Sequence, residues 1–353
     1  MASIANASNQ HIDYLSQLLL SSDHSQDLSA SEFEACLTLA HKNHVVVRWL
    51  QMLPQTALGQ DPRIAELGHT ALTEELSRIS HALPFLESIC NEFHSQGYDI
   101  TVIKSLDHWP DLGSDLDLYS NAQPKDVIRI MRDRFKAEVA ERSWGDRLAG
   151  KWNFNIPDLP EAVEIHVGRL GQTGEHVAWA DGIPRRAVEV QRAQYRFRVA
   201  SPEDRLMIST LQRMYRHFYF RLCDIVDSAQ LLESGIVDFT RLKSYSESPG
   251  IWKGVATYLV LVSDYVKRFR PTEVPLPSSV RAEATFGGEK LTFGRDFLRV
   301  PILPESVSLY ATELTTLARQ GEFKETFRLS LLPYLAVAAA VGQKLTGSDK
   351  GIW

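Results

Sequence analysis

The hydrophobic period of the chain changes twice along its length, and this change restricts the folds that the chain can adopt. Up to residue 97, apolar side chains recur at three- and four-residue intervals, which predicts amphipathic helices. From 98 to 199 apolar and polar residues alternate over short runs, which predicts strands with one buried face. From 201 to about 270 the helical period returns. We therefore expect an α+β fold, with a mixed β-sheet core flanked by N-terminal and C-terminal helical regions.

The N-terminal region carries two helix start signals. Ser29, followed three residues later by a glutamate, matches a capping box ahead of an apolar run. Asp61 and Pro62 match an N-cap followed by proline at the first helical position, and the helix that they open is expected to end at Gly97. Proline inside a helix removes a hydrogen bond and clashes with the preceding turn, so Pro84 should kink or divide this helix.

The central segment contains the strands that we expect to form the sheet. They are short, alternate in polarity, and are rich in β-branched and aromatic residues. One helical pattern interrupts them, and a hairpin follows them. The expected strands are 99–105, 115–120, 137–143, 152–156 and 162–170, the helix is 124–135, and the hairpin pairs 188–191 with 195–199.

The last part of the chain begins with a strong helix signal at Ser201, which is followed by proline and two acidic residues. Residues 271–304 hold five prolines and three glycines, which indicates a loop with one hairpin around Gly287 and Gly288. Two helical segments follow, and we interpret the apolar stretch 329–341 as a buried helix. The expected division is an N-terminal helical region at 1–97, a core at 98–199, a helical domain lining a cleft at 200–270, and a loop, hairpin and C-terminal helices at 271–353.

Composition excludes several classes of partner. With 38 Lys and Arg against 44 Asp and Glu, the net charge of -6 does not favour the phosphate backbone of nucleic acid. Cys36, Cys90 and Cys223 are odd in number, far apart, and outside any C-x-x-C or His-paired spacing, which predicts a reducing interior with no disulfide framework and no structural zinc. The longest apolar stretch is shorter than the ~20 residues that span a bilayer, and the first residues do not form a signal peptide. We expect a cytoplasmic protein without a membrane partner.

Two acids on one expected strand are the first candidate site. Successive side chains of a strand point to opposite faces, so Asp115 and Asp117 share one face while Leu116 and Leu118 enter the core. Carboxylates ~6–7 Å apart along a strand can both reach a divalent ion, and hard oxygen ligands suit Mg²⁺. The alternative is a half-exposed strand that simply places its acids in water. Ser114, in the loop that enters the strand, belongs to the candidate site.

A second expected strand carries Glu164 and His166 on one face and three aliphatic residues on the other. If this strand lies near the first, Glu164 completes a cluster of three carboxylates. Such a cluster is stable as anions chiefly when cations lie between its members, which is typical of two-metal phosphoryl or nucleotidyl transfer. His166 could orient Glu164, contact phosphate, ligate a metal, or serve only as a hydrogen-bonded structural residue.

In order and spacing, these residues resemble the DNA polymerase β-like nucleotidyltransferase superfamily, and more closely an uncharacterised bacterial nucleotidyltransferase family within it. The resemblance covers about 100 to 262 and implies a nucleotidyltransferase-type mixed sheet. It implies that Asp115, Asp117 and Glu164 are the catalytic carboxylates and hold two Mg²⁺ ions. It also implies that Lys104 and Ser105 lie beside the phosphates of an NTP substrate. The matching segments are 103–105, 113–118 and 163–166, followed by 201–206, 221–227 and 237–239 in the helical tail.

One position departs from this family. Ser105 stands where the family usually has glycine, which lets backbone N–H groups approach the triphosphate closely. The serine can still offer a hydroxyl, but the phosphate cradle is changed. A catalytically inactive binding module that keeps the fold is therefore an alternative function.

Basic residues follow on the expected helix that begins at Pro202. Arg213, Arg216 and Arg221 recur on one face, where they would hold a triphosphate by paired hydrogen bonds if that face lines the cleft. A polar stripe opposite an apolar one is also what any surface helix shows. Lys151 adds positive charge that could steer an anionic substrate or could belong to a solvated face.

The leading hypothesis is a Mg²⁺-dependent nucleotidyltransferase that moves a nucleoside monophosphate from an NTP to a hydroxyl or phosphate of a small-molecule or protein acceptor and releases pyrophosphate. A metal-dependent phosphohydrolase is a weaker alternative, because no H-D or H-x-x-x-D spacing accompanies the acids. A nucleic acid acceptor is not expected. The sequence specifies neither the acceptor nor which NTP is used.

Overall fold

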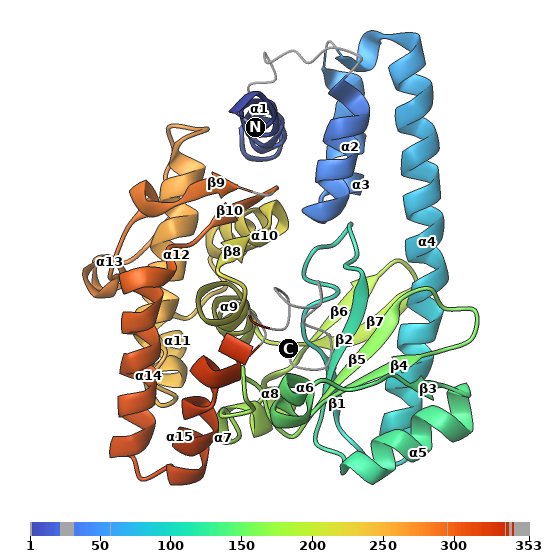
Figure 1. The fold of residues 1–353 in the computed structure, drawn as a ribbon. Helices are drawn as coiled ribbons and strands as arrows, with labels where there is room; N and C mark the ends of the chain where they lie inside the picture. The colour runs from blue at the N-terminus through green and yellow to red at the C-terminus, as the bar shows by residue number, and fades with distance from the viewer. Residues whose placement is uncertain are drawn as a thin grey trace.

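The computed structural model describes residues 2–21, 32–56, 58–294, 296–335, 337–338 and 341. Figure 1 shows a mixed α+β fold in which helices from both ends of the chain flank a seven-stranded sheet. The fold class expected from the change in hydrophobic period is confirmed.

The N-terminal helical region ends in one long helix that runs along the sheet (Figure 1). Its start is as expected, because the Asp61 side chain accepts a hydrogen bond of 2.8 Å from the Arg63 N–H. The expected division at Pro84 does not occur, and the apolar residues on both sides of this proline, Leu83 and Leu86, pack into the same core. Ser29 lies outside the described residues. The helices are α1 (Ala2–Leu20), α2 (Phe33–Lys42), α3 (Val46–Met52) and α4 (Pro62–Ser95).

The sheet has the strand order β3-β4-β5-β2-β1-β7-β6 and mixes parallel and antiparallel neighbours. The central pair, β2 and β5, is parallel, and the β6–β7 hairpin is antiparallel as expected. Several strands are shorter than the alternation predicted. They are β1 (Ile100–Val102), β2 (Asp115–Ser120), β3 (Glu138–Val139), β4 (Lys151–Asn155), β5 (Ala162–Val167), β6 (Val188–Arg192) and β7 (Tyr195–Val199).

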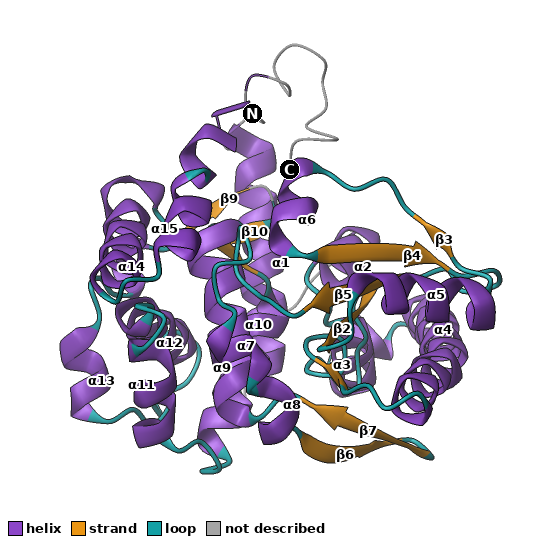
Figure 2. Ribbon diagram, turned by 90° about the horizontal axis from the view of Figure 1, so that it is seen from below, coloured by secondary structure: helices purple, strands orange, loops and turns teal. Residues whose placement is uncertain are grey.

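The two faces of the sheet have different roles. Leu116, Leu118 and Ile165 are fully buried and pack in one core with α4 and α5 (Pro124–Phe135), which was predicted over these residues. Figure 2 shows the sheet between these two helices and the C-terminal helices. The opposite face of β2 and β5 therefore faces the C-terminal half of the molecule. Three short helices complete this half of the chain, namely α6 (Trp144–Ala149), α7 (Ala178–Asp181) and α8 (Ile183–Arg186).

The C-terminal half begins as expected, with the Ser201 hydroxyl accepting a hydrogen bond of 3.2 Å from the Asp204 N–H. The continuous helical period predicted beyond it is wrong in one place. A π-helical turn at Leu211–Arg216 and the short strand β8 (Tyr219–Phe220) separate α9 from α10, and Phe218 between them has a positive φ of 53°. The helices are α9 (Pro202–Thr210), α10 (Leu222–Glu233), α11 (Phe239–Glu247), α12 (Trp252–Lys267), α13 (Ser278–Glu283), α14 (Val307–Arg319) and α15 (Phe323–Ser330).

Strand β8 pairs with a hairpin that comes from the proline-rich segment. The hairpin consists of β9 (Thr292–Gly294) and β10 (Phe297–Arg299), and β10 lies between β8 and β9. The hairpin expected around Gly287 and Gly288 is therefore displaced toward the C-terminus, and these glycines instead precede the hairpin at the start of a short 3₁₀ turn.

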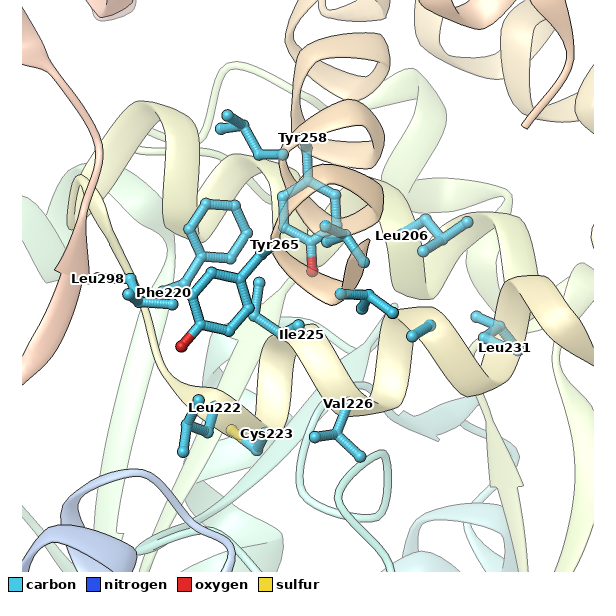
Figure 3. Close-up of a cluster of buried hydrophobic side chains, with 14 of the residues drawn as sticks. Leu206, Phe220, Leu222, Cys223, Ile225, Val226, Leu231, Tyr258, Tyr265 and Leu298 are labelled. Atoms are coloured by element: carbon cyan, nitrogen blue, oxygen red, sulfur yellow. The ribbon is translucent and has the colours of Figure 1, made fainter. Parts of the chain in front are cut away.

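The helical core forms around α10 and α12 (Figure 3). Tyr258 and Tyr265 of α12 are fully buried, and both satisfy their hydroxyl groups. The Tyr258 hydroxyl lies 2.7 Å from Ser228 Oγ, and the Tyr265 hydroxyl lies 2.8 Å from Ser16 Oγ. Tyr265 thereby connects α1 to a helix about 250 residues away in sequence.

The buried helix predicted over 329–341 is wrong for the residues that the structure describes. Leu329 is buried, but Tyr334, Val337 and Val341 are 75%, 64% and 49% exposed. The sequence has the apolar pattern of a buried helix here, but no described element covers these three side chains. No helix in the described part of the chain combines the length and apolarity needed to cross a bilayer.

Truncating a sheet residue should test the core beneath the candidate acids. Leu118→Ala should lower the free energy of unfolding by about 2–5 kcal/mol, because it opens a cavity in a fully buried layer. Leu67→Ala is the matched control, since Leu67 is 49% exposed on α4 and its truncation should change stability by less than ~0.5 kcal/mol. Urea denaturation measures both, and equal losses would contradict this packing.

Candidate functional site

A polar cavity of about 200 Å³ lies over the acid-bearing face of β2 and β5. Its other walls come from the β1–β2 loop, the start of β4, the end of α2 and the π-helical turn. The fold brings nine of the ten expected site residues to this one cavity, and only His166 does not line it. The nine are Lys104, Ser105, Ser114, Asp115, Asp117, Glu164, Arg213, Arg216 and Arg221.

The acids meet through the register of the parallel strand pair. Asp117 of β2 lies directly opposite Glu164 of β5, and Asp115 lies opposite Ala162. One possible ligand atom from each of Asp117, Glu164 and His166 lies within 4.8 Å of the others. Asp115 is the exposed residue at the start of β2 and is not part of this group. The structure therefore places two carboxylates together inside the cavity, with the third at its mouth.

Two lysines neutralise these carboxylates. The Lys104 ammonium forms an ion pair with Asp117 and lies 3.3 Å from Glu164 Oε1. The Lys151 ammonium lies 2.5 Å from Glu164 Oε2, and its side chain is only 12% exposed. Lys151 is thus part of the site and does not belong to a solvated face. Like charges that share a buried site need such counter-charges.

The pKa values of the two acids shift in opposite directions. Burial raises the pKa of Asp117 to about 7, with the Lys104 charge opposing and the Glu164 charge adding to the shift. Burial also acts to raise the pKa of Glu164, but Lys104, the hydrogen bond to His166 and Lys151 together hold it well below its usual range. Glu164 is therefore the permanent anion of the pair, and Asp117 becomes charged near neutral pH.

His166 supports Glu164 from the strand. Its Nε2 lies 2.8 Å from Glu164 Oε1, and the ring is 5% exposed. Burial lowers the pKa of His166 to about 4 although Glu164 opposes this shift, so the ring is neutral at pH 7 and can donate from Nε2. The described residues give His166 a contact that orients Glu164, and its ring nitrogen also belongs to the group with Asp117 and Glu164 that could hold a metal ion.

Ser105 uses its hydroxyl within the protein. The hydroxyl donates to the Asp115 carbonyl at 3.0 Å and accepts from the Asp117 N–H at 2.6 Å. The residue is 1% exposed. Ser105 therefore ties the β1–β2 loop to the acid-bearing strand, and its hydroxyl is already committed where we expected it to be offered to phosphate.

The basic wall of the cavity is built differently from the expected helix face. Arg213 and Arg216 belong to the π-helical turn, and Arg221 precedes α10. Arg213 is 3% exposed, and its Nε lies 2.7 Å from Asp224 Oδ2, so its guanidinium is already held by a buried partner. π-helical turns within helices are frequent at functional sites.

Several lining residues were not found from the sequence. They carry no short motif and come from distant segments, so only the tertiary fold brings them together. Lys151 was named from the sequence only as a charge that could steer an anionic substrate, although alternation along its strand points it to the face that neighbours Glu164. The residues missed are His44, His108, Gln212 and Tyr219.

Comparisons with known proteins give little similarity. No protein-family model matches the chain, and no curated protein matches it. Among solved structures, the chain is similar to an antigenic nucleotidyltransferase-like protein from Paracoccidioides brasiliensis, with 12% sequence identity and a TM-score of 0.31. That match covers 50% of this chain and 92% of the other. This similarity is too low to indicate a function, so the chemistry of the cavity is inferred from its own side chains.

The raised pKa of Asp117 makes stability depend on pH. Unfolded aspartate has a pKa of about 3.9, and folded Asp117 keeps its proton up to about pH 7, so its contribution to stability is fully present below about pH 4 and is lost as pH rises from there through about pH 7. In EDTA, wild type should lose about 2–3 kcal/mol more unfolding free energy between about pH 5 and pH 8 than Asp117→Asn does. Urea denaturation gives this difference.

The comparison removes the titration of Asp117, and the buried titratable groups outside the cavity, among them Asp107 and Glu313, are present in both proteins. Asp133→Asn, on the exposed side of α5, is the matched control and should follow wild type. An Asp117→Asn curve parallel to that of wild type would show that burial does not shift this carboxyl.

Proposed function

We propose that the chain is a Mg²⁺-dependent nucleotidyltransferase that transfers a nucleoside monophosphate from an NTP to a hydroxyl or phosphate of an acceptor and releases pyrophosphate. The main support for this proposal is the register of β2 and β5, which places Asp117 opposite Glu164. Asp115 lines the same cavity from the start of β2. Acids on one sheet face and arginines on the facing wall supply the two kinds of group that a metal-bound triphosphate requires.

The donor set fits Mg²⁺. Its carboxylate oxygens are hard ligands, and the Lys104 ammonium, which lies beside both Asp117 and Glu164, stands in for a cation between them. Asp115, Asp117 and Glu164 would hold the ions, which when bound activate the attacking oxygen and neutralise the leaving pyrophosphate. His166 keeps Glu164 oriented by its hydrogen bond.

The basic residues would bind the triphosphate. Lys104 lines the cavity on a flexible side chain and would contact a phosphate oxygen in place of Asp117. Arg216 and Arg221 line the same cavity and would contact phosphate oxygens. Arg213 would support this wall through its ion pair with Asp224.

A second cavity offers room for an acceptor. It has a volume of about 340 Å³ and shares His44 and Ser114 with the first. Arg78 in its wall is paired with Glu75 and Glu161, at 2.6 Å and 2.5 Å, so the wall has no cationic excess to attract a polyanion. A small molecule fits this space better than a nucleic acid does.

The competing function is a catalytically inactive module that keeps the fold. The committed hydroxyl of Ser105 favours it, because this position then offers phosphate neither a free hydroxyl nor the close backbone approach that glycine allows. Such a module would bind a ligand in the cavity without turnover. NTP turnover measured together with NTP binding separates the two functions.

Removing two carboxylates should abolish the activity. Asp115→Asn combined with Asp117→Asn should lower NTP turnover in Mg²⁺ by at least ~100-fold, because bound metal supplies several kcal/mol of transition-state stabilisation. Pyrophosphate release with each NTP is the measurement, and Asp133→Asn is the control that keeps full activity. Turnover that survives in the double variant would overturn the proposal, as would the absence of both binding and turnover with every NTP.

Replacing the lysine between the acids should separate metal binding from nucleotide binding. Lys104→Met should raise the affinity for Mg²⁺ alone by about tenfold or more, because it removes a competing cation beside two carboxylates. The same variant should weaken NTP binding, since a phosphate contact is lost. Calorimetry measures both affinities, with Lys125→Met on the surface of α5 as the control. Unchanged affinities for both ligands would place Lys104 outside the binding site.

A further inference from the structure

We propose that His44, His108 and Cys223 form a second metal centre, selective for Zn²⁺ and related transition metals, in the wall of the same cavity. One possible ligand atom from each of the three residues lies within 4.8 Å of the others. This centre is distinct from the carboxylate site and does not depend on nucleotidyl transfer. Thiolate and imidazole are ligands that select Zn²⁺ over Mg²⁺.

The distance between the ligand atoms of Cys223 and His108 fits tetrahedral coordination. With metal–sulfur and metal–nitrogen bonds of about 2.3 and 2.0 Å, a tetrahedral site places sulfur and nitrogen about 3.5 Å apart. Cys223 Sγ lies 3.8 Å from His108 Nε2. Only a small adjustment is needed for both to bind one ion.

The second ring nitrogen of His108, Nδ1, contacts a carboxylate, as in many zinc sites. Nδ1 lies 2.5 Å from Asp227 Oδ2, and Asp227 Oδ1 lies 2.6 Å from Arg48 Nη1. Arg48 also binds Asp111, with Nε 2.7 Å from Oδ2. A carboxylate behind a ligating histidine fixes the ring and directs its other nitrogen to the metal. His108 therefore presents Nε2 toward the sulfur.

The other two ligands are fixed by contacts between α2 and α10. His44 follows the C-terminus of α2, and its buried Nδ1 has no hydrogen-bond partner among the described residues. Asn43 accepts the Leu222 N–H at its side chain, at 2.9 Å, and the Cys223 N–H at its carbonyl, at 3.2 Å. Figure 3 shows Cys223 in the first turn of α10, on the side away from Tyr258.

A nucleophilic Cys223–His108–Asp227 triad would use some of the same contacts, but the burial of the thiol argues against it. Cys223 is 0% exposed and does not line the cavity, so a substrate carbon or phosphorus cannot reach its sulfur. His44 and His108 do line the cavity. A metal held between them and the sulfur would have three protein ligands and a fourth position facing the cavity, open to water or to a ligand atom.

The sequence predicted no zinc site, because the three ligands lie in segments far apart in the chain and match no metal-binding spacing. They come from the end of α2, the β1–β2 loop and the start of α10. Binding replaces the thiol proton by metal, so uptake of the ion releases at least one proton.

Cobalt substitution tests the centre directly. Purified full-length protein, stripped with a chelator, should bind one equivalent of Co²⁺ and show a thiolate-to-cobalt charge-transfer band that one equivalent of Zn²⁺ removes. This band requires sulfur, so neither the Asp117–Glu164–His166 group nor the buried Glu175–His176–Glu313 group can produce it. Cys223→Ser should abolish the band.

Matched variants keep the test decisive. Cys36→Ser and Cys90→Ser remove the other cysteines, which are also free and buried, and should leave the band intact, as should Asp115→Asn with Asp117→Asn. His44→Asn removes one ligand at a residue with a φ of 52°, a conformation that asparagine tolerates, so it should fold and bind Co²⁺ at least ~10-fold more weakly. The proposal is overturned if no band appears, if the band persists in Cys223→Ser, or if His44→Asn binds as tightly as wild type.

Discussion

The repulsion between Asp117 and Glu164 is the interaction around which the cavity is organised. Their side chains are adjacent because β2 and β5 pair in a fixed parallel register. A slip of one residue would turn every side chain of the strand to the other face, burying acids and exposing aliphatic residues such as Leu118. The apolar core under the sheet therefore holds two carboxyl groups together, and they carry like charges once Asp117 ionises near neutral pH. The ion pairs that Lys104 and Lys151 form with these carboxylates offset the repulsion between them.

The face that each acid occupies on its own strand follows from local alternation, which explains why it could be predicted. Alternation placed Asp115 and Asp117 on one face of β2, and it placed Glu164 on the face of β5 opposite the aliphatic residues that identified the core. The pairing of β2 with β5, which brings Glu164 to Asp117, could be stated from the sequence only as a condition. Capping residues located the starts of α4 and α9 for the same reason, since the interactions involved span only a few residues. Such features need no knowledge of the rest of the fold.

What could not be predicted depends on contacts between distant segments. The π-helical turn and β8 interrupt a helical pattern because β10 pairs with β8 from about eighty residues away. The exposed face at Tyr334 has the apolar pattern of a buried helix, but burial requires a partner that a periodicity does not supply. Ser105 was expected to offer its hydroxyl to a ligand, and the neighbouring backbone uses that hydroxyl first.

The pairing of β8 with β10 also sets an order of events during synthesis. Tyr219 lines the cavity from β8, and its ladder partner is Arg299. When the sheet residues that carry the acids have been synthesised, the nascent chain still lacks β10, the strand that pairs with β8 beside the arginine-bearing wall. The cavity is therefore completed only after the hairpin has left the ribosome, so the growing chain does not carry a finished site while its core is still forming.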